Sequence, residues 1–577
     1  MIRSRKKGST LDKSIFIIIG IMIIAAFFRI VLGQIIGNQF YCSETMDDVL
    51  LMQYSHIKAH FLYPNLWSLV KTMGFPYYLA FISLIHLNYT FSLSFLWLLA
   101  ALSIFDVIQR YFKNKYVSLM AYLYFLFLPI AFDSWMGTRI YRNAIIAPFV
   151  ILFFSLLLMN IKEMISNEKK NRKQIIVLFL RTFLLGFIFT FTYYIKEDGL
   201  WLLACLTFFS IVAIIFVCYY AIKRKQWQQG IIYMIIICIP FVSFSYCTQR
   251  YKNLNEKYFG VSAIQTRTAG ELGTFVNNVY KIDSDNQNWY IWAPEDSIEK
   301  VFKASPTLKK HPELLQAIEQ TPWYQGDISK NPIQGDFLTW VLRSALNDTG
   351  MWKSEKQVDH FFARVNAEID EAFNTGKLKK TNKVQLLSSA VGRNQGEITS
   401  LFPLVAHNIH NTLYLRGYIP GSVIGNTNIN TEMASKAAKI TRIEYLTDYS
   451  QRNQSSMDRA NKIVSCIFVI YGFINPLLFV CMIIFLIFQL ILLIFVKTKN
   501  KWQLYHIKCL LRNGLIILIF GICIAYSFSI NWFSQFIFKN AINDQTMNFY
   551  TVALPPLLGF AYMFSIGNFV AIWKGIK

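Results

Sequence analysis

The sequence predicts an α-helical polytopic membrane protein with about ten transmembrane helices, and three observations lead to this fold class. Of the 577 residues, 54% are hydrophobic and 16% aromatic, and the mean hydropathy is +0.36. Most of these apolar residues lie in uninterrupted runs of membrane length. A polar stretch of ordinary soluble composition is inserted before the last three runs, where we expect a mainly helical domain outside the membrane.

The predicted transmembrane helices follow from apolar runs that approach the roughly 20 residues needed to cross a hydrocarbon core of about 30 Å. They cover residues 14–33, 90–111, 116–132, 140–160, 174–194, 199–220, 231–247, 464–495, 510–530 and 549–573. Residues 75–87 are apolar but too short to cross, so we expect a half-helix or an interfacial helix leading into the second span. The chain therefore divides into residues 1–247, 248–460 and 461–577.

Basic residues in the short loops predict the orientation, because cytoplasmic loops are enriched in Lys and Arg. Residues 249–461 contain 25 basic and 22 acidic residues, whereas the rest of the chain contains 32 basic and 11 acidic residues. With the N-terminus inside, the basic loops at 110–115, 162–173, 223–225 and 497–501 all fall on the inner side, and so does the C-terminus. We therefore expect a multi-pass protein of the plasma membrane with residues 248–460 extracytoplasmic. This distribution of the +24 net charge argues against a nucleic-acid partner.

The first outer loop, residues 34–76, contains the adjacent acids Asp47 and Asp48 just beyond the first span. Apolar and aromatic residues follow them, and we interpret these as one or two amphipathic helices at the membrane interface. Two neighbouring carboxylates repel each other when both are buried and ionised, so we expect a raised pKa or a cation partner for one of them. Either property suits a general base or a metal ligand. The alternative is that both acids only complement the dipole at the start of a helix.

Two further outer loops contain charged clusters. The segment Arg139-Ile140-Tyr141-Arg142-Asn143 has two arginines at the start of a helix, and guanidinium groups match phosphate oxygens in a bidentate geometry. The tight loop Lys196-Glu197-Asp198-Gly199 leaves little room for three charges unless they meet a partner. The alternatives are an interfacial belt with snorkelling arginines and a solvated hairpin. Arg29, near the outer end of the first span, also needs an interior partner and is a candidate for the same site.

The region 248–460 offers weaker signals. Ser354 to Gly376 is its clearest helix, with a capping residue, apolar residues at helical spacing and a terminating glycine. Candidates for substrate contact are Tyr251, Lys252, Arg267, Glu271, Trp323, Asp336, Trp340 and Arg343. His56 and His60 have the spacing of a metal pair, but no third ligand is evident.

Several short motifs together resemble a known superfamily. Thr45-Met46-Asp47-Asp48 follows the first span, the outer loop ends in Lys71-Thr72-Met73-Gly74-Phe75-Pro76, and many spans and a large outer region come after it. This order resembles the GT-C superfamily of membrane glycosyltransferases. The stretches 47–52, Tyr141-Arg142-Asn143, Lys196-Glu197-Asp198-Gly199 and Gly335-Asp336-Phe337-Leu338-Thr339-Trp340 are similar to a bacterial family of uncharacterised GT-C-like proteins. The resemblance covers most of the chain.

The resemblance implies an inverting glycosyltransferase that uses a polyprenyl-phosphate-linked sugar donor at the outer face of a bacterial membrane. Asp47 or Asp48 would be the catalytic base, and we prefer Asp47 because it comes first after the span. The predicted substrate-binding residues are Arg139, Tyr141, Arg142, Asn143, Lys196, Glu197, Asp198, Arg267 and Asp336. Among them, the cations Arg139, Arg142 and Lys196 would offset the charge on the leaving lipid phosphate. The acceptor would be a glycopolymer or lipid of the cell envelope.

Two points in this resemblance stay open. Many members have their outer domain at the C-terminal end, whereas here it precedes the last three spans, so acceptor-binding residues do not transfer. Some members need a divalent metal and others do not. The two aspartates together with Glu197 and Asp198 would offer ligands for Mg²⁺ or Mn²⁺.

Two other function classes are alternatives. A transporter or flippase of a lipid-linked glycan would need polar residues near mid-membrane and usually shows repeated halves. Here the charges cluster at one face and the sequence shows no repeat. A non-catalytic envelope scaffold predicts that the outer acids are dispensable. The sequence has no G-x-x-x-x-G-K-[ST] and no G-x-S-x-G motif, so ATP-driven transport and serine acyl transfer lack support.

Overall fold

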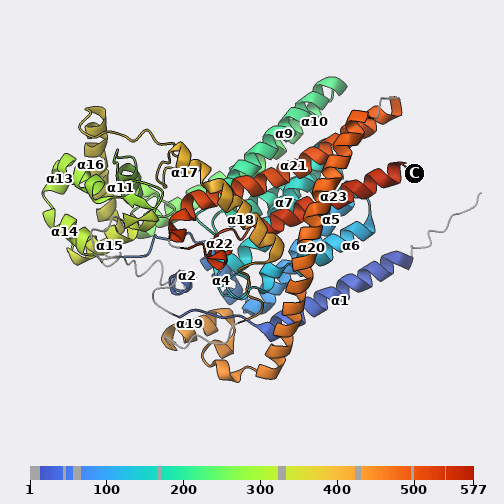
Figure 1. Ribbon diagram of the computed structural model, residues 1–577, viewed down its shortest axis with the longest axis horizontal. Helices are drawn as coiled ribbons and strands as arrows, with labels where there is room; N and C mark the ends of the chain where they lie inside the picture. Colours follow the sequence, from blue (N-terminus) through green and yellow to red (C-terminus); the bar gives the residue numbers. More distant parts are fainter. Residues whose placement is uncertain are drawn as a thin grey trace, which may run out of the picture.

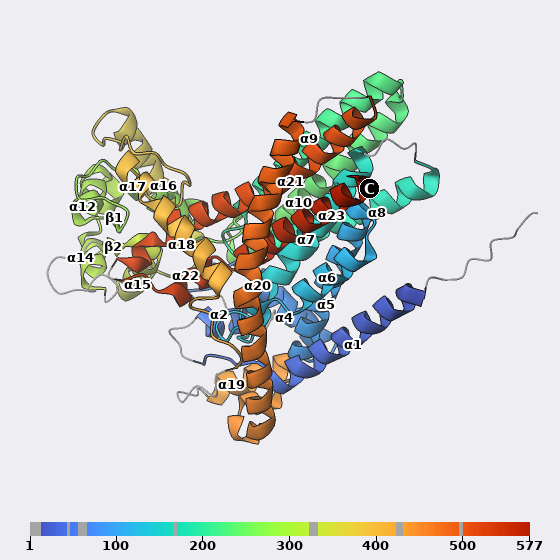
Figure 2. The ribbon, with the colours of Figure 1, turned by 45° about the vertical axis from the view of Figure 1, so that its right-hand side comes forward.

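Long helices run side by side in a bundle, and shorter helices form a lobe at one end of it (Figures 1 and 2). This arrangement comes from a computed structural model, which describes residues 13–42, 47–55, 66–165, 170–321, 333–422, 431–495, 500–539 and 541–576. Thr45, Met46, His56, His60 and Trp323 lie outside the described residues. We call residues 261–400 the lobe, and the end of the bundle next to them the lobe end.

Within the described residues, ten helical segments are long and apolar enough to cross a membrane, which confirms an α-helical polytopic fold. They are α1 (Lys13–Ile36), α5 (Tyr89–Phe112), α6 with η1 (Lys115–Leu126 and Pro129–Phe132), α7 (Arg142–Ile165), α8 (Arg172–Tyr193), α9 (Leu200–Arg224), α10 (Trp227–Phe259), α20 (Gln454–Phe495), α21 (Asn500–Ser534) and α23 (Leu554–Ile576). Three of them extend well beyond the predicted runs, because α10 continues into polar sequence at its C-terminal end and α20 and α21 begin in polar sequence.

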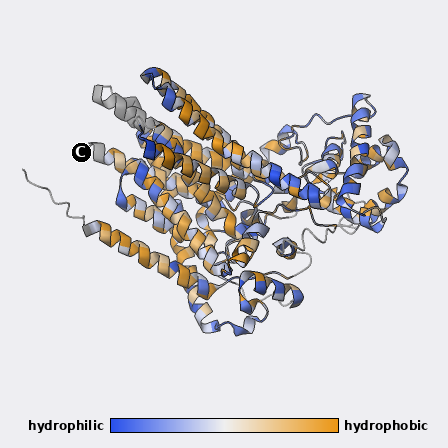
Figure 3. Cartoon of the chain, turned by 180° about the vertical axis from the view of Figure 1, so that it is seen from behind, coloured by the Kyte–Doolittle hydropathy of each residue, from blue (hydrophilic) through white to orange (hydrophobic). Residues whose placement is uncertain are grey.

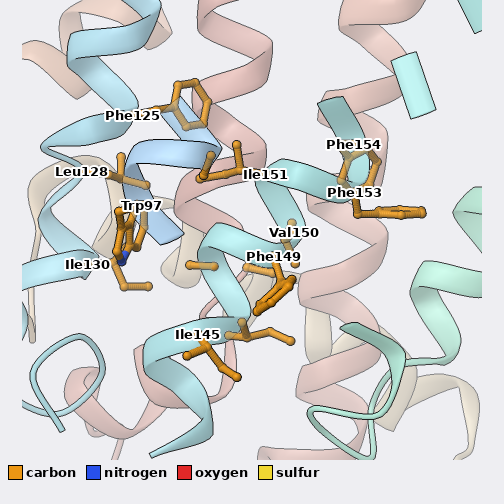
Figure 4. Close-up of a cluster of buried hydrophobic side chains, with 14 of the residues drawn as sticks. Trp97, Phe125, Leu128, Ile130, Ile145, Phe149, Val150, Ile151, Phe153 and Phe154 are labelled. Carbon is orange, nitrogen blue, oxygen red and sulfur yellow. The ribbon is translucent and has the colours of Figure 1, made fainter. Parts of the chain in front are cut away.

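The helix α7 lies at the centre of the bundle and is buried along almost its whole length. Trp97 of α5, Phe125 of α6, and Ile145 and Ile151 of α7 belong to the apolar core between these helices (Figure 4). The outer helices instead present apolar side chains on their free surface, whereas the lobe is largely hydrophilic (Figure 3). Apolar surface of this extent is unfavourable in water and suits contact with lipid.

The short apolar run between the first two spans forms α4 (Gly74–Leu84), which is too short to cross a membrane. A turn at residues 85–88 connects it to α5, where Asn88 caps the helix by accepting from the N–H of Phe91 at 3.1 Å. At the start of α4, the N–H of Gly74 donates to the carbonyl of Tyr194 at 2.8 Å. A Cβ at position 74 would lie 2.4 Å from that carbonyl oxygen, so glycine allows α4 to touch the loop after α8.

The lobe has a core of its own that the last spans complete. Its elements are α11 (Gly270–Tyr280), β1 (Ile291–Ala293), α12 (Glu295–Ala304), α13 (Pro306–Lys309), α14 (Pro312–Gln320), β2 (Ile333–Gln334), η2 (Gly335–Phe337), α15 (Leu338–Asp348), α16 (Glu355–Asn374) and α17 (Gln395–Thr399). Strands β1 and β2 pair antiparallel. Trp532 of α21 and Phe536 of η5 (Gln535–Phe538) pack into the lobe core, so this core is shared with the bundle.

The predicted helix from Ser354 to Gly376 is confirmed as α16. The hydroxyl of Ser354 accepts from the N–H of Gln357 at 3.2 Å, which satisfies one of the free donors at the helix start. Gly376 follows the helix with a φ of +75°, a left-handed conformation that favours glycine. The apolar side of α16 packs into the lobe core.

The chain returns from the lobe to the bundle through short elements. These are α18 (Leu401–Tyr414), α19 (Thr431–Thr441), η3 (Glu444–Leu446) and η4 (Tyr449–Gln451). The helix α18 packs against α20, α21 and the short α22 (Asp544–Tyr550), and α19 packs against α4. In the first outer loop, α2 (Asp47–Ser55) also packs against α4 and is mostly buried. Gln53 is the exposed residue of α2, so this helix does not present the free apolar face that was predicted for it, and its position relative to the membrane interface stays a prediction.

Candidate active site

Asp48, in the first turn of α2, forms a buried ion pair with Arg139. The Nε of Arg139 donates to Oδ1 of Asp48 at 2.7 Å, and the Nη2 of Arg139 donates to Oδ2, so the pair is bidentate. The side chain of Asp48 is 0% exposed. Burial raises the pKa of Asp48, and the guanidinium of Arg139 acts against that rise. With both oxygens occupied, Asp48 is suited to holding α2 in place.

Four aromatic rings surround the guanidinium of Arg139. Its central carbon lies 4.7 Å from the ring centres of Tyr41 and Tyr141, 5.0 Å from Trp135 and 5.6 Å from Phe549. Each ring face attracts the positive charge, and this attraction is strongest where water is excluded. The ion pair with Asp48 and the four rings together fix Arg139 in one position.

The loop that carries Arg139 is anchored by Asp133. One carboxylate oxygen of Asp133 accepts from the backbone N–H groups of Trp135 and Met136, both at 2.9 Å, and the other accepts from the N–H of Ile419 at 2.7 Å. Burial raises the pKa of Asp133 to about 7, although these three hydrogen bonds act against the rise. Asp133 thereby ties the loop after η1 to the segment that leaves α18.

Asp47 differs from its neighbour because its side chain is 33% exposed. Its Oδ2 accepts from the Nζ of Lys71 at 2.8 Å and from the hydroxyl of Tyr141 at 3.1 Å, and it lies 3.6 Å from Nη2 of Arg142. None of these three contacts involves Oδ1. Burial raises the pKa of Asp47, but the charges of Lys71 and Arg142 outweigh this effect and place the pKa well below its usual range. The predicted cation partner is therefore present for both acids.

The loop between α8 and α9 brings the predicted residues 196–198 to the same cluster. Nη1 of Arg142 donates to Oε2 of Glu197 at 2.6 Å, and the N–H of Thr72 donates to Oε1 of Glu197 at 3.3 Å. Burial raises the pKa of Glu197, but Arg142 and Lys71 outweigh it and lower the pKa to about 2. Lys196 forms an ion pair with Asp198 at 3.7 Å. Burial lowers the pKa of Lys196 despite this pairing.

The lobe contributes Arg267 and Asp336, which form an ion pair with each other. The charge of Arg267 also contributes to lowering the pKa values of Asp47 and Glu197. Among the other described lobe candidates, the ring centre of Trp340 lies 5.3 Å from the Nζ of Lys71, and Oε2 of Glu271 accepts from the Nδ2 of Asn366 at 2.8 Å. Arg343 is buried, pairs with Glu355 at 3.1 Å and donates to the carbonyl of Leu66, so it holds the turn before Lys71.

The charges of the cluster cancel. Its ion pairs join Asp47 with Lys71 and Arg142, Asp48 with Arg139, Glu197 with Arg142, Asp198 with Lys196, and Asp336 with Arg267. These pairs contain five acids and five cations. Buried charges of one sign are costly unless neutralised, so this balance allows ten charged groups to lie close together.

A cavity of about 380 Å³ opens beside Asp47. It is lined by Asp47, Trp135, Arg139, Tyr141, Asn543, Gln545, Thr546, Phe549 and Tyr550. Five of these residues come from the segment 543–550, and Phe549 and Tyr550, which were predicted to begin the last span, belong to α22 instead. Two features of the sequence indicate that the last span begins later. Asn543-Asp544-Gln545-Thr546 is polar, and Pro555-Pro556 marks a helix start, since prolines are favoured in the first turn of a helix. The sequence motif 71–76 contains Lys71 but does not predict its contact with Asp47.

Two predicted residues lie outside the ion-pair cluster. The Nδ2 of Asn143 donates to the backbone carbonyl of Phe549 at 3.0 Å, so Asn143 holds the cavity wall from behind. The guanidinium of Arg29 lies 4.4 Å from the ring centre of Phe132, and its Nη1 is 3.5 Å from the hydroxyl of Ser94. Arg29 therefore supports the start of the loop that Asp133 anchors.

The acids of the site do not form a metal centre. In the part of the chain that the structure describes, no group of three or more His, Cys, Asp and Glu side chains is placed to hold a metal ion. Asp47, Asp48 and Glu197 are each paired with a lysine or an arginine. This donor set does not fit the Mg²⁺ or Mn²⁺ that the acids alone would allow.

Comparisons with known proteins add no assignment. No family model matches the chain, and neither a curated protein nor a solved structure matches it.

Proposed function

We propose that the chain is a membrane glycosyltransferase that transfers a sugar from a polyprenyl-phosphate donor to a glycopolymer or lipid of the cell envelope. The observation that carries this proposal is the setting of Asp47, a partly open carboxylate with a cavity on one side and Lys71 and Arg142 on the other. Transfer of a sugar from a phosphate leaving group needs a base for the acceptor hydroxyl and cations for the phosphate. The resemblance to the GT-C superfamily supports the same assignment.

In the proposed reaction, Asp47 is the general base. Its Oδ1 accepts the proton of an acceptor hydroxyl, and the acceptor oxygen attacks the anomeric carbon of the donor sugar. The bond from that carbon to the phosphate oxygen breaks, its electron pair leaves with the lipid phosphate, and the configuration inverts. The low pKa of Asp47 keeps the carboxylate ionised and able to accept the proton throughout the physiological pH range.

Lys71 and Arg142 would change partners during this step. A carboxylate whose charge is held by two cations is a weak base, because those cations oppose protonation. When the proton arrives, Asp47 loses its charge just as the leaving phosphate gains one. Lys71 and Arg142 would then stabilise the phosphate, and their release from Asp47 would raise its basicity. Because the charges of the cluster balance, this exchange of ion-pair partners would cost little free energy.

Asp48 would act as a positioning residue in this scheme. Its two oxygens hold Arg139, and its place in the first turn of α2 orients Asp47, the preceding residue. Substitution of Asp48 would therefore act on the reaction through the geometry of Asp47.

The orientation proposed for the chain puts the lobe end on the outer face of a bacterial plasma membrane, with both termini in the cytoplasm. Support comes from the basic residues of the connections α5–α6, α7–α8 and α9–α10, because helix alternation puts these at the end opposite the loop 194–199. On the outer face a lipid-linked donor would be available without a nucleotide.

The test compares Asp47→Asn with Asp285→Asn, a matched change at an exposed acid of the lobe. Both variants are expressed at equal levels in cells that lack the wild-type chain, and labelled sugar in the envelope fraction is measured. We expect Asp47→Asn to reduce incorporation by about 100-fold or more, the usual contribution of a general base. We expect Asp285→Asn to match the wild type.

Full incorporation with Asp47→Asn would overturn the base assignment. A transporter or flippase would instead show counterflow of a lipid-linked sugar in vesicles without any transfer product. Reconstituted vesicles with a polyprenyl-phosphate sugar therefore separate the two function classes, since only the enzyme forms a new glycosidic bond.

A further inference from the structure

The lining of the cavity beside Asp47 has an unusual composition for a membrane protein. Of its nine residues, four are aromatic and three are neutral polar, the others being Asp47 and Arg139, and none is aliphatic. A lipid acyl chain is ordinarily met by aliphatic side chains. Amides and hydroxyls both donate and accept hydrogen bonds, as sugar hydroxyls require, and aromatic rings pack against the apolar face of a sugar ring.

The polar wall belongs to α22, and its backbone is held rigidly. The Nε2 of His407 lies 2.6 Å from Oδ1 of Asp544, and the Nδ2 of Asn411 donates to the same oxygen at 3.1 Å. Further along the helix, the Nδ2 of Asn548 donates to the carbonyl of Arg416 at 2.7 Å. These contacts fix α22 against α18 and the chain after it, so the wall is formed before any ligand arrives.

Gln545 presents a donor that the protein itself leaves unused. Its Nε2 is buried and makes no hydrogen bond within the described part of the chain. A buried donor without an acceptor is unfavourable, so a ligand that supplies an acceptor oxygen there would bind more tightly than one that does not. Gln545 also lines the cavity, so its side-chain amide lies close to the space that a ligand would fill.

From these observations we infer that the cavity binds a pyranose ring, with Gln545 and Thr546 contacting its hydroxyl groups and Trp135 and Phe549 its apolar face. This inference rests on the proposed function, and it makes the acceptor a glycan rather than a lipid or a protein side chain. The cavity is near the small end of the usual range for ligand pockets, about 300–1,000 Å³, which suits one ring better than a long chain. One hydroxyl of the bound ring would face Asp47.

The experiment measures saturation-transfer NMR of small probes with the purified full chain in lipid nanodiscs. The sugar probes are the methyl glycosides of glucose, galactose, mannose and N-acetylglucosamine. Hexanol represents an acyl chain, and N-acetylserinamide represents a protein side chain. The variants are Gln545→Leu and Thr546→Val. Their matched controls are Gln249→Leu on α10 and Thr274→Val on α11, both at exposed positions.

We expect at least one methyl glycoside to bind the wild type and both controls. Loss of one buried hydrogen bond should weaken that binding about tenfold in Gln545→Leu and in Thr546→Val. Absence of binding by every glycoside up to its solubility limit would overturn the inference. So would equal binding by the cavity variants, or binding of hexanol or N-acetylserinamide alone.

Failure of this inference is distinguishable from failure of the proposed function. Glycoside binding that depends on Gln545, without transfer that depends on Asp47, would leave the sugar subsite intact and remove the transferase. Transfer that depends on Asp47, without glycoside binding, would leave the transferase intact and make its acceptor something other than a glycan.

Discussion

Asp47 and Asp48 show how one helical turn separates two chemically identical side chains. Successive residues of an α-helix point about 100° apart, so neighbours face different surroundings. Asp48 points into the protein and accepts from two nitrogens of Arg139, whereas Asp47 points to the cavity edge and shares one oxygen among three partners. The first is suited to structure and the second to proton transfer.

At the residue scale, Asp48→Asn should destabilise the protein. The change leaves the guanidinium of Arg139 buried without its counter-ion, and removing one member of a buried pair costs about 3–5 kcal/mol. The four rings around Arg139 offset only part of this loss. Thermal unfolding of the purified protein in detergent measures the effect, with Asp285→Asn as the control. An unchanged unfolding midpoint would contradict a structural role for Asp48.

Asp133 predicts a pH dependence of stability. Its pKa rises from the ordinary 3.8 to about 7 in the folded chain, so the native state binds this proton more tightly than the unfolded state does. The stability from this proton is complete below pH 3.8 and is lost as the pH rises through about 7. We expect the unfolding midpoint of the wild type to fall over this range relative to Asp133→Asn. Parallel pH curves for the two proteins would refute this prediction.

At the element scale, the contact between α4 and the loop after α8 places Lys71 and Thr72 next to Glu197. Gly74→Ala would put a methyl group 2.4 Å from a backbone oxygen of Tyr194, which cannot rotate away. We expect a loss of about 1–3 kcal/mol from overpacking, together with reduced sugar incorporation as Lys71 shifts. Gly20→Ala on α1 is the control, because a Cβ there meets no atom within 4 Å. Equal stability of the two variants would contradict the tight contact.

The helices of the bundle were predictable because lipid imposes a minimum apolar length on each span, and α16 was predictable from its capping serine and terminating glycine. The end of α21 and the start of α23 were harder to predict from the sequence. Residues 549–553 continue the apolar run of α23 in sequence, yet Phe549 and Tyr550 belong to α22 and line the cavity. Hydropathy alone does not separate an aromatic wall from a membrane span.

The pairing of charges within the site was beyond sequence reasoning. Asp47 meets Lys71, 24 positions away, and Asp48 meets Arg139, 91 positions away. The sequence predicted that the charged loops lie on one face of the membrane, and most of the site residues belong to these loops. The packing of α4 against the loop after α8 and of the lobe against residues 66–69 then decides which charges touch. Such contacts follow from tertiary structure and leave no local pattern.

At the scale of the whole molecule, the proposed orientation is directly testable. In a cysteine-free background, a cysteine at Asp285 in the lobe should react with an impermeant maleimide in intact cells. A cysteine at Lys225, between α9 and α10 at the opposite end of the bundle, should react only after lysis. Both positions are exposed, so a difference in labelling reports the side of the membrane. The reverse pattern would overturn the orientation and the proposed donor.

The cancelling charges of the site affect how a substrate would reach it. Five acids and five cations leave the cluster without net charge, and salt screens the field of its ion pairs over about 8 Å at physiological ionic strength. Free phosphates and nucleotides in the surrounding fluid are then not drawn toward the cluster. A lipid-anchored donor would arrive by lateral diffusion in the bilayer, and its capture would be nearly independent of salt.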